Sequence, residues 1–364
     1  MHVADLRLRN HRITKPGPAG PEKLVKWMGA VQAQEYGPAK WGLGLRLSGS
    51  TTDAAIERAI DQGRILRTHV LRPTWHFVTP ADIRWMLELT GPRLHQRMAP
   101  YDRVLGLHAK LMTRAVSVIE RALGEHRYQT RRELGAELGR TRLPAKSMEL
   151  AHIMMYAELE GVICSGPRRG KQSTYALLSD RVPAARSLPR DEALAKLTRR
   201  YLRSHGPATL RDFVWWSGLR TADARRGLEM IPAKSLEVGG INYWTVGGSP
   251  FPLGQRKSAV HLLPIYDEYL VSYRDHRVVP RPAYVLGGFQ HALVISGQVA
   301  GTWRTTRTPT GVTLVAEPAR RLSTGERRGL AREVTRYQRF LGVPVSLSVT
   351  KHARPSVGAR TGLP

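Results

Sequence analysis

The sequence predicts an α+β fold in which tandem units, each made of helices followed by a β-hairpin, precede a C-terminal mixed β domain. A helix, helix, hairpin order can be read between residues 128 and 178, and it recurs between residues 191 and 248. From Gln255 onward the pattern changes to short strands. A length of 364 residues favours two or three domains, and 41% apolar residues are enough for their hydrophobic cores.

The repeat is clearest between residues 128 and 178. Thr130-Arg131-Arg132-Glu133 has the pattern of a capping box, which predicts a helix start, and a second helix is expected to stop at Gly161. Residues 162–164 and 174–178 are predicted strands, joined by the basic, turn-rich segment 165–171. This is the element order of a winged helix, in which the second helix approaches the DNA groove and the wing contacts phosphates.

Two further units follow the same plan. Residues 191–204 and a helix capped by Thr209 lead to a hairpin with a Gly239-Gly240 turn. Near the N-terminus, helices around 20–32 and 52–62 precede a pair of strands. The predicted domains are a first winged-helix-like unit at 1–124, a second at 125–190, a third at 191–250, a β-rich domain with a final helix at 251–350, and a flexible tail at 351–364.

The C-terminal domain is predicted from alternating apolar segments. Strands are expected at 291–295, 298–303 and 312–316. Ser323-Thr324-Gly325-Glu326 predicts the start of a last, basic helix that extends to about Leu341.

The net charge of +28 points to a polyanionic partner. Basic residues are in excess along the whole chain rather than in one tail, so we expect a basic concave surface that follows a phosphate backbone. GC-rich coding alone can favour arginine over lysine. It does not explain why 57 basic residues face only 29 acidic ones.

The composition argues against several kinds of site. Cys164 is the only cysteine, which excludes an internal disulfide and a cysteine-based zinc site, and the 13 histidines lack metal-ligand spacing. We therefore predict no metal and no cofactor. No stretch approaches the length of a membrane span and the N-terminus has no apolar signal core, so a cytoplasmic protein without a membrane partner is expected.

The most informative candidate site is Val31-Gln32-Ala33-Gln34. An amphipathic segment precedes it and Gly37-Pro38 follows, which predicts a helix exit with an extended backbone. Residues at i and i+2 of an extended chain share one side, so Gln32 and Gln34 are expected to face one cleft while Ala33 turns inward. Two glutamines beside an alanine are also common on ordinary surfaces.

A second candidate is the dense block from Arg67 to Val78. Alternation predicts Arg67, His69 and His76 on one polar side of a strand-like path, with Trp75 and Phe77 on the other. Arg72 can lean to either side. Cations and titratable rings at this density suit a phosphate site or the stabilisation of developing charge, although a single such histidine is more often structural.

These blocks belong to a longer pattern. Its segments are Leu24 to Leu45, Arg67 to His76, Thr79 to Asp82, Gly91 to Arg93, His261 to Arg277, and Gly301 to Arg304. Together they resemble the winged-helix AlkZ and YcaQ DNA glycosylases over nearly the whole chain. In that family a Gln-x-Gln or Gln-x-Asp motif lies in the catalytic cleft, so the resemblance implies that Gln32 and Gln34 are catalytic.

The resemblance also implies an activity. It indicates a monofunctional glycosylase that removes N7-alkylated purines from double-stranded DNA, including guanines crosslinked by azinomycin-type agents, in DNA repair or in self-resistance to an alkylating natural product. An N7-alkylguanine already carries a positive charge, so the main tasks are to place water at C1′ and to tolerate an oxocarbenium-like sugar. A glutamine pair can position water but cannot act as a true general base.

Neighbouring charged residues have less certain parts. Glu35 is a candidate to stabilise the sugar cation, although it should point away from the glutamines, and Lys40 is interpreted as a solvated surface lysine rather than a nucleophile. Two basic hairpin tips are candidates to probe a DNA groove, or to be solvated wings. Their predicted DNA-binding residues, together with those of the second block, are Arg67, His69, Arg72, His76, Arg168, Arg169, Lys171, Arg304 and Arg307.

Two other functions fit part of this pattern. A winged-helix transcriptional regulator would share the basic wings, but regulators usually dimerise to match two half-sites. A nonenzymatic DNA-binding protein would explain the charge but not the glutamine pair. Several DNA-binding units in one chain favour a monomer.

Overall fold

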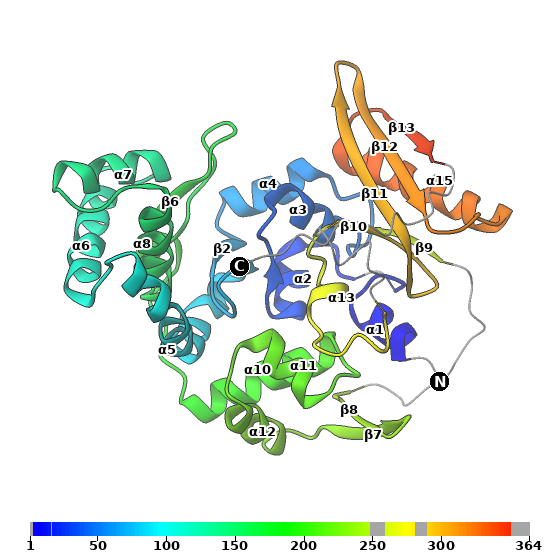
Figure 1. The fold of residues 1–364 in the computed structure, drawn as a ribbon, viewed down its shortest axis with the longest axis horizontal. Helices are drawn as coiled ribbons and strands as arrows, with labels where there is room; N and C mark the ends of the chain where they lie inside the picture. Colours follow the sequence, from blue (N-terminus) through cyan, green and yellow to red (C-terminus); the bar gives the residue numbers. More distant parts are fainter. Residues whose placement is uncertain (1–2, 16, 248–258, 281–289, 351–364) are drawn as a thin grey trace.

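The computed structural model describes residues 3–15, 17–247, 259–280 and 290–350. Figure 1 shows the first helical unit in the middle of the molecule. The second unit lies on the left, the third below, and the C-terminal sheet at the upper right. The fold is α+β, as predicted. The predicted tail at 351–364 lies outside the described residues.

The first unit has the element order of a winged helix. Its β1-β3-β2 sheet is antiparallel, with Gln32 opposite His76 and Arg67 opposite Phe77. Its elements are α2 (Pro21–Met28), β1 (Val31–Gln32), α3 (Tyr36–Gly44), α4 (Asp53–Asp61), β2 (Leu66–His69) and β3 (Trp75–Val78).

The second unit repeats this order. The capping box between Thr130 and Glu133 is present, and the sheet has the equivalent strand order, β4-β6-β5. Its elements are α6 (Ala109–Glu125), β4 (Gln129–Thr130), α7 (Arg131–Arg140), α8 (Ser147–Leu159), β5 (Ile163–Ser165) and β6 (Thr174–Leu177). Its hydrophobic core includes α6, so the unit starts near Leu105 rather than at residue 125.

The third unit ends in the expected hairpin. Thr209 and Asp212 form a capping box, and the turn residues Gly239 and Gly240 both have positive φ, which glycine adopts without strain. Its elements are α10 (Arg190–Ser204), α11 (Leu210–Ser217), α12 (Thr221–Glu229), β7 (Lys234–Val238) and β8 (Ile241–Thr245).

The C-terminal domain is a five-stranded sheet of order β13-β12-β11-β10-β9 with α15 packed on it. α15 begins where predicted, and Ser323 and Glu326 form a capping box at its start. Strand β13 is not predicted by the sequence pattern. The elements are β9 (Val260–Leu263), α13 (Glu268–Val271), β10 (His291–Ile295), β11 (Gln298–Thr308), β12 (Gly311–Pro318), α15 (Thr324–Leu341) and β13 (Val345–Val349).

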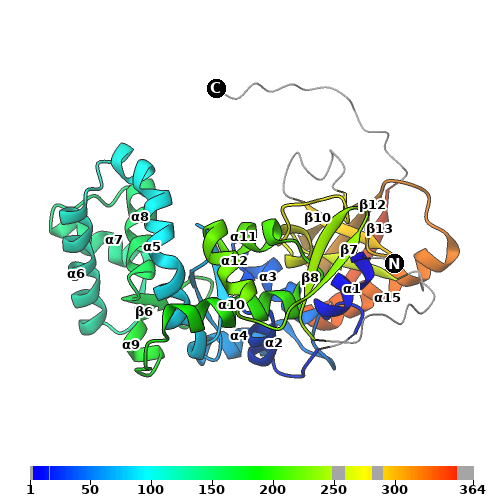
Figure 2. The ribbon, with the colours of Figure 1, turned by 90° about the horizontal axis from the view of Figure 1, so that it is seen from below.

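Of the described helices, three connect or flank these units: α1 (Val3–Asn10), α5 (Pro80–Val104) and α9 (Leu178–Arg181). The 25-residue helix α5 is not predicted by the sequence pattern, because prolines such as Pro92 and Pro100 usually end or kink a helix, yet α5 continues through both. Figure 2 shows α5 between the second unit and the rest of the molecule. Among the described residues, no helix has the length and apolar character that crossing a membrane requires.

The hydrophobic cores place the first unit at the centre. One core joins α2, α3 and α4 to the C-terminal sheet and α15. Another joins β2, β3 and α5 to the helices of the third unit. The second unit keeps a core of its own. Polar residues at the edge of the β1-β3-β2 sheet therefore lie where the first unit, the third unit and the C-terminal domain meet.

Candidate active site

Gln32 and Gln34 lie where β1 passes into α3. Gln32 is the last residue of β1, the chain bends at Gln34 and Glu35, and Glu35 is the N-cap of α3. Between the glutamines, Ala33 is fully buried and its N–H donates to the carbonyl of Trp75 at 2.7 Å. Both glutamines line one cleft. The shared orientation and the inward alanine agree with the sequence prediction.

The cleft has a volume of about 670 Å³ and is built from four parts of the chain. The first unit supplies the glutamines and the β2–β3 loop, α5 supplies two arginines one turn apart, and the end of α11 supplies an exposed tryptophan. The C-terminal domain closes the remaining side. The lining residues are Gln32, Gln34, Arg72, Pro73, Thr74, Arg93, Arg97, Val214, Trp215, Gly218, Leu219, Tyr266 and Val271.

Arg72 fixes the side chain of Gln32. Its guanidinium donates to Oε1 of Gln32 at 3.1 Å and to the carbonyl of Val271 at 3.2 Å. Because a guanidinium only donates, the group of Gln32 that faces it must be the oxygen. Gln34 is held more weakly, since its Oε1 accepts from the N–H of Trp75 at 3.4 Å.

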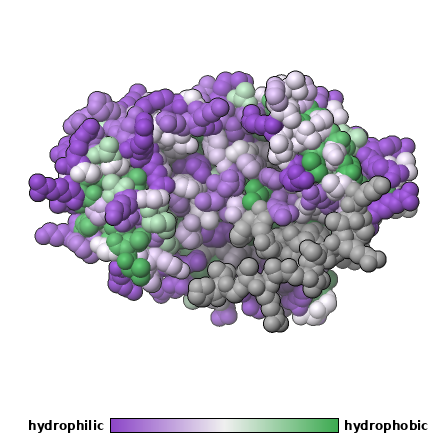
Figure 3. All heavy atoms as spheres, turned by 45° about the horizontal axis from the view of Figure 1, so that its top comes forward, coloured by the Kyte–Doolittle hydropathy of each residue, from purple (hydrophilic) through white to green (hydrophobic). Residues whose placement is uncertain are grey.

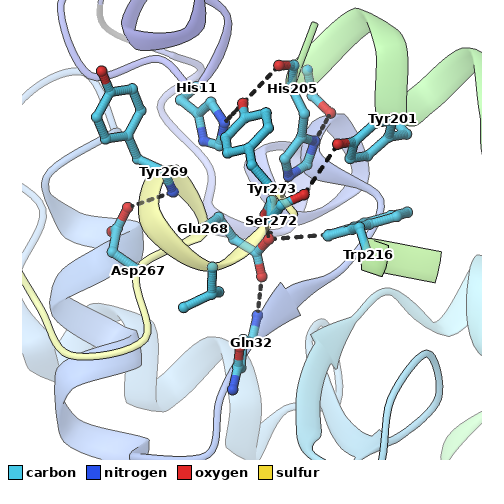
Figure 4. Close-up of polar contacts among 12 residues, drawn as sticks. His11, Gln32, Tyr201, His205, Trp216, Asp267, Glu268, Tyr269, Ser272 and Tyr273 are labelled. Carbon is cyan, nitrogen blue, oxygen red and sulfur yellow. Dashed lines mark hydrogen bonds and ion pairs between the residues drawn. The ribbon is translucent and has the colours of Figure 1, made fainter. Parts of the chain in front are cut away.

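A buried carboxylate lies directly behind Gln32 (Figure 4). Oε1 of Glu268 accepts from the backbone N–H of Gln32 at 2.6 Å, and Oε2 accepts from Nε1 of Trp216 at 3.0 Å. Oε2 also accepts from the hydroxyl of Ser272 and lies 3.4 Å from Nε2 of His205. Glu268 is only 1% exposed, so these groups, rather than water, solvate its charge.

The ionisation of this cluster follows from its contacts. Burial acts to raise the pKa of Glu268, but the hydrogen bond from His205, the charge of Arg72 and the hydrogen bond from Ser272 act against it, and the pKa lies below its usual value. Burial lowers the pKa of His205 in spite of its contact with Glu268. The carboxylate is therefore ionised near neutral pH and Arg72 is its main cationic counterpart.

His76 is buried beneath the same strand. Its Nδ1 lies 2.8 Å from the carbonyl of Thr74, and its Nε2 has no hydrogen-bond partner among the described residues. Burial, followed by the charge of Arg72, lowers the pKa of His76 to about 3. The ring is therefore neutral and adds no positive charge under Gln32.

The predicted polar side of the second block is wrong. Residues 66–78 form a hairpin, and the strand register places Arg67 opposite Phe77 and His69 opposite Trp75, whereas His76 pairs with Thr68 and Gln32. Directly opposite residues share a face of the sheet. His76 therefore lies on the face opposite that of Arg67 and His69, because the chain reverses between them.

The outcomes for these residues as DNA contacts differ. Arg67 donates to the carbonyls of Ala33 and Gln34 at 2.9 and 3.2 Å, so it supports the extended segment from behind. His69 is buried against the carboxylate of Glu158, and His76 is fully buried, so neither ring is placed to contact DNA. Of the four predicted DNA contacts in this block, only Arg72 lines the cleft.

The two charged residues near the glutamines, Glu35 and Lys40, differ in exposure. Glu35 is exposed and does not line the cleft, in agreement with its expected direction. The interpretation of Lys40 as a solvated lysine is wrong: it is 4% exposed, and its ammonium donates to Asp53 at 2.8 Å and Glu57 at 2.5 Å. Packing of α3 on α4 brings these three residues together. Lys40 is thus a buried residue whose ion pairs join α3 to α4.

The two basic hairpins project from the body in Figure 1, one from the second unit and one from the C-terminal sheet. In the first, Arg168 lies over the ring of Tyr36, Arg169 pairs with Glu133 at 2.7 Å, and Lys171 is exposed. In the β11–β12 hairpin, Arg304 pairs with Glu317 and Arg307 is exposed. Hydrophilic side chains cover much of the face in Figure 3, with an apolar patch over the second unit at the left.

Four residues of the site were not recognised in the sequence. Arg93, Arg97 and Trp215 line the cleft, and Glu268 lies behind it. The four-residue spacing of Arg93 and Arg97 was a usable signal once a helix was recognised there. Glu268 gave none, because 236 residues separate it from Gln32. Among the described residues, no group of three or more histidines, cysteines or acids is placed to bind a metal.

Comparison with known proteins adds the family to this geometry. The model of the family described as "DNA glycosylase AlkZ-like" matches residues 25–340, which contain the cleft and most of each unit. The chain belongs to the AlkZ-like DNA glycosylases. It is therefore a DNA glycosylase, and the alternative interpretations as a regulator or an architectural protein are not needed to explain its charge.

Two relatives of this AlkZ-like chain carry the comparison further. It is 24% identical over 304 residues to the "Interstrand DNA cross-link repair glycosylase" of Streptomyces sahachiroi, covering 75% of this chain and 79% of that protein. Its fold matches the solved structure of Streptomyces sahachiroi DNA glycosylase AlkZ with a TM-score of 0.79 and 19% identity. That match covers 96% of this chain and 98% of the other.

Proposed function

We propose that this AlkZ-like protein is a monofunctional glycosylase that hydrolyses the N-glycosidic bond of N7-alkylated purines in double-stranded DNA. The observation that carries the proposal is the open cleft in which Gln32 and Gln34 lie beside Arg72, Arg93 and Arg97. The arginines suit the phosphates around a target nucleotide, and the glutamines suit the placement of water.

The chemistry needs little from the protein at the leaving group. An N7-alkylated base is cationic, so it takes the electron pair of the breaking C1′–N9 bond and leaves neutral. The oxygen of water bonds to C1′, and its proton passes to solvent. The glutamine pair contributes by positioning that water and the nucleotide relative to each other, with the water on the far side of the sugar from the base, which is catalysis by proximity and orientation.

Hydrolysis without strand cleavage is also part of the proposal. A glycosylase with lyase activity needs an amine that can form a Schiff base with C1′. None of the described residues that line the cleft is a lysine, and the ammonium of Lys40 is held by two carboxylates. The expected product is therefore an intact strand with an abasic site.

We further propose that crosslinked guanines are substrates. A guanine tied to the opposite strand cannot rotate into a deep, closed pocket, so an open cleft is the arrangement that such a lesion requires. The name of the Streptomyces sahachiroi relative records interstrand cross-link repair for that protein. A role in self-resistance to an azinomycin-type agent, as a cytoplasmic monomer, completes the proposal.

The test uses one duplex with a single N7-methylguanine. Alkali after incubation should break the strand at the lesion, because an abasic site is alkali-labile, whereas omission of alkali should leave it intact. The Gln32→Ala, Gln34→Ala double variant should lose this activity. Cleavage that survives the double variant would remove the glutamines from the mechanism, and no excision from any alkylated duplex would overturn the proposed function.

A further inference from the structure

We propose that Glu268 is a positioning residue for the reaction: it anchors Gln32 through the backbone N–H and offsets the charge of Arg72, the residue that orients the Gln32 amide. This inference rests on the proposed function of the cleft. Glu268 does not touch the cleft itself, so it acts through Gln32 and Arg72.

The anchor is visible in Figure 4. The carboxylate sits between α13, α10 and α11 and meets the backbone N–H of Gln32 at 2.6 Å, with Trp216 and Ser272 completing its hydrogen bonds. Hydrogen bonds to an ionised acceptor are about twice as strong as neutral ones. Since Gln32 is the last residue of β1, this contact fixes the point where the strand leaves the sheet.

The consequence for the side chain is an unequal pair of glutamines. Oε1 of Gln32 is occupied by Arg72, so its N–H groups are the part turned away from the guanidinium and available to the substrate. Oε1 of Gln34 has only the long contact to Trp75 and keeps acceptor capacity. Gln34 is thus the acceptor for the attacking water, and Gln32 donates to an oxygen or nitrogen of the nucleotide.

Glu268 also balances charge. The reaction places a positive sugar near Arg72, and neighbouring positive charge opposes that state. The ionised carboxylate bonds the backbone of Gln32 and Arg72 bonds its side chain, so the two opposite charges lie on either side of this residue, while His76 and His205 stay neutral because they are buried. The charges of Glu268 and Arg72 therefore nearly cancel beside Gln32. A carboxylate inside the motif, as in Gln-x-Asp, would otherwise supply this negative charge.

The principal test is Glu268→Gln under single-turnover conditions with enzyme in excess over the N7-methylguanine duplex. We expect the excision rate to fall about 100-fold, the scale of a small misplacement of a catalytic group, while the DNA dissociation constant changes less than threefold. In the Gln32→Ala background the same change should have little further effect, because both act through one group. Equal losses in both backgrounds would overturn the proposal.

The matched control is Asp267→Asn. Asp267 is the neighbouring buried carboxylate, it pairs with Arg46, and it caps α13, a task that asparagine also performs. It makes no contact with Gln32. This variant should lose stability yet keep the wild-type rate per folded molecule. A rate loss equal to that of Glu268→Gln would mean that any disturbance of α13 suffices, and would overturn the specific role.

A second readout does not depend on activity. The proton of the Gln32 backbone amide should resonate far downfield in the wild type and exchange slowly, and Glu268→Asp, which withdraws the carboxylate, should shift it upfield. An unshifted resonance would overturn the anchor even if Glu268→Gln fails to fold. If the wild type excises no lesion, the proposed function fails on that observation alone and this measurement still decides the contact.

Discussion

The first and second winged units have the same strand order but use it differently. The register Gln32 to His76 in the first corresponds to Thr130 to Thr174 in the second. In the second unit Thr130 caps α7 at once, through a complete capping box. In the first, Ala33, Gln34 and Glu35 separate β1 from α3, whose start has no side-chain cap.

The loops between the last two strands of these units, their wings, also differ. The β2–β3 loop of the first unit, Arg72 to Thr74, folds into the cleft. The longer wing of the second unit carries its basic residues at an exposed tip. In the second unit the first strand leads directly into a helix, and what this unit presents to DNA is its backbone and its basic residues. In the first unit three residues are added between strand and helix. They position polar side chains in the cleft, and the helix that follows has no side-chain cap.

The largest effect is expected from a change in the segment 33–35, which the first unit has and the second unit lacks. Gln34→Ala should lower the single-turnover excision rate about 100-fold, since it removes the acceptor for water while leaving the fold intact. The measurement is base release from an N7-methylguanine duplex at saturating enzyme. A rate within threefold of the wild type would show that the added segment is not the chemical part of the first unit.

Acid should affect the two units unequally. Burial lowers the pKa of His76 to about 3 and the pKa values of His261 and His291 to about 4, and these residues belong to the first unit and the C-terminal sheet. Because the unfolded chain binds their protons below pH 6.5 and the native state does not, stability is full above that pH and falls as the pH drops. Each histidine contributes about 1.4 kcal/mol per pH unit.

Hydrogen exchange at pH 7 and pH 5 measures this difference by region. Amides in β3, β9 and β10 should lose protection at pH 5 well before those of α6, α7 and α8. Equal loss of protection in both regions would show that the cores do not respond separately to acid.

The wing of the second unit should affect binding and not chemistry. Lys171→Ala removes one exposed charge, so the slope of log binding constant against log salt should become shallower by about one. The excision rate at saturating enzyme should stay unchanged. A titration of DNA affinity at several salt concentrations checks this, and a slower saturated rate with an unchanged slope would place this wing in the chemistry instead.

The smallest expected effect is at the counterpart of Gln32. Thr130→Ala removes the cap of α7 and should lower the free energy of unfolding of the second unit by about 1 kcal/mol. Excision per folded molecule should be unaffected. Denaturant unfolding followed by a probe in the second unit gives the first quantity, and a changed rate would contradict the division between the units.

What the sequence could predict was local. The capping boxes at Thr130, Thr209 and Ser323 involve residues three apart, so they can be read directly and each is present. The shared direction of Gln32 and Gln34 followed from the period of an extended chain. Glu268 could not be placed, because its contact with Gln32 depends on packing between distant segments.

The errors have the same cause. Lys40 looked solvated because its carboxylate partners lie on another helix, and His76 was assigned to the wrong face because the chain reverses between β2 and β3. The prolines of α5 hid a long helix that tertiary contacts stabilise. Each missing fact concerns how elements pack, which spacing along one element does not contain.

The most direct test of the account asks which unit holds the lesion. Cys164 is buried and its thiol pKa is raised by burial to about 12, so an introduced cysteine will be the reactive one. We compare Gln34→Cys with Lys171→Cys on a duplex whose abasic-site analogue carries an activated disulfide tether. The account predicts rapid crosslinking to Cys at the first position and little at the second. Crosslinking that is equal, or faster at the wing, would contradict it.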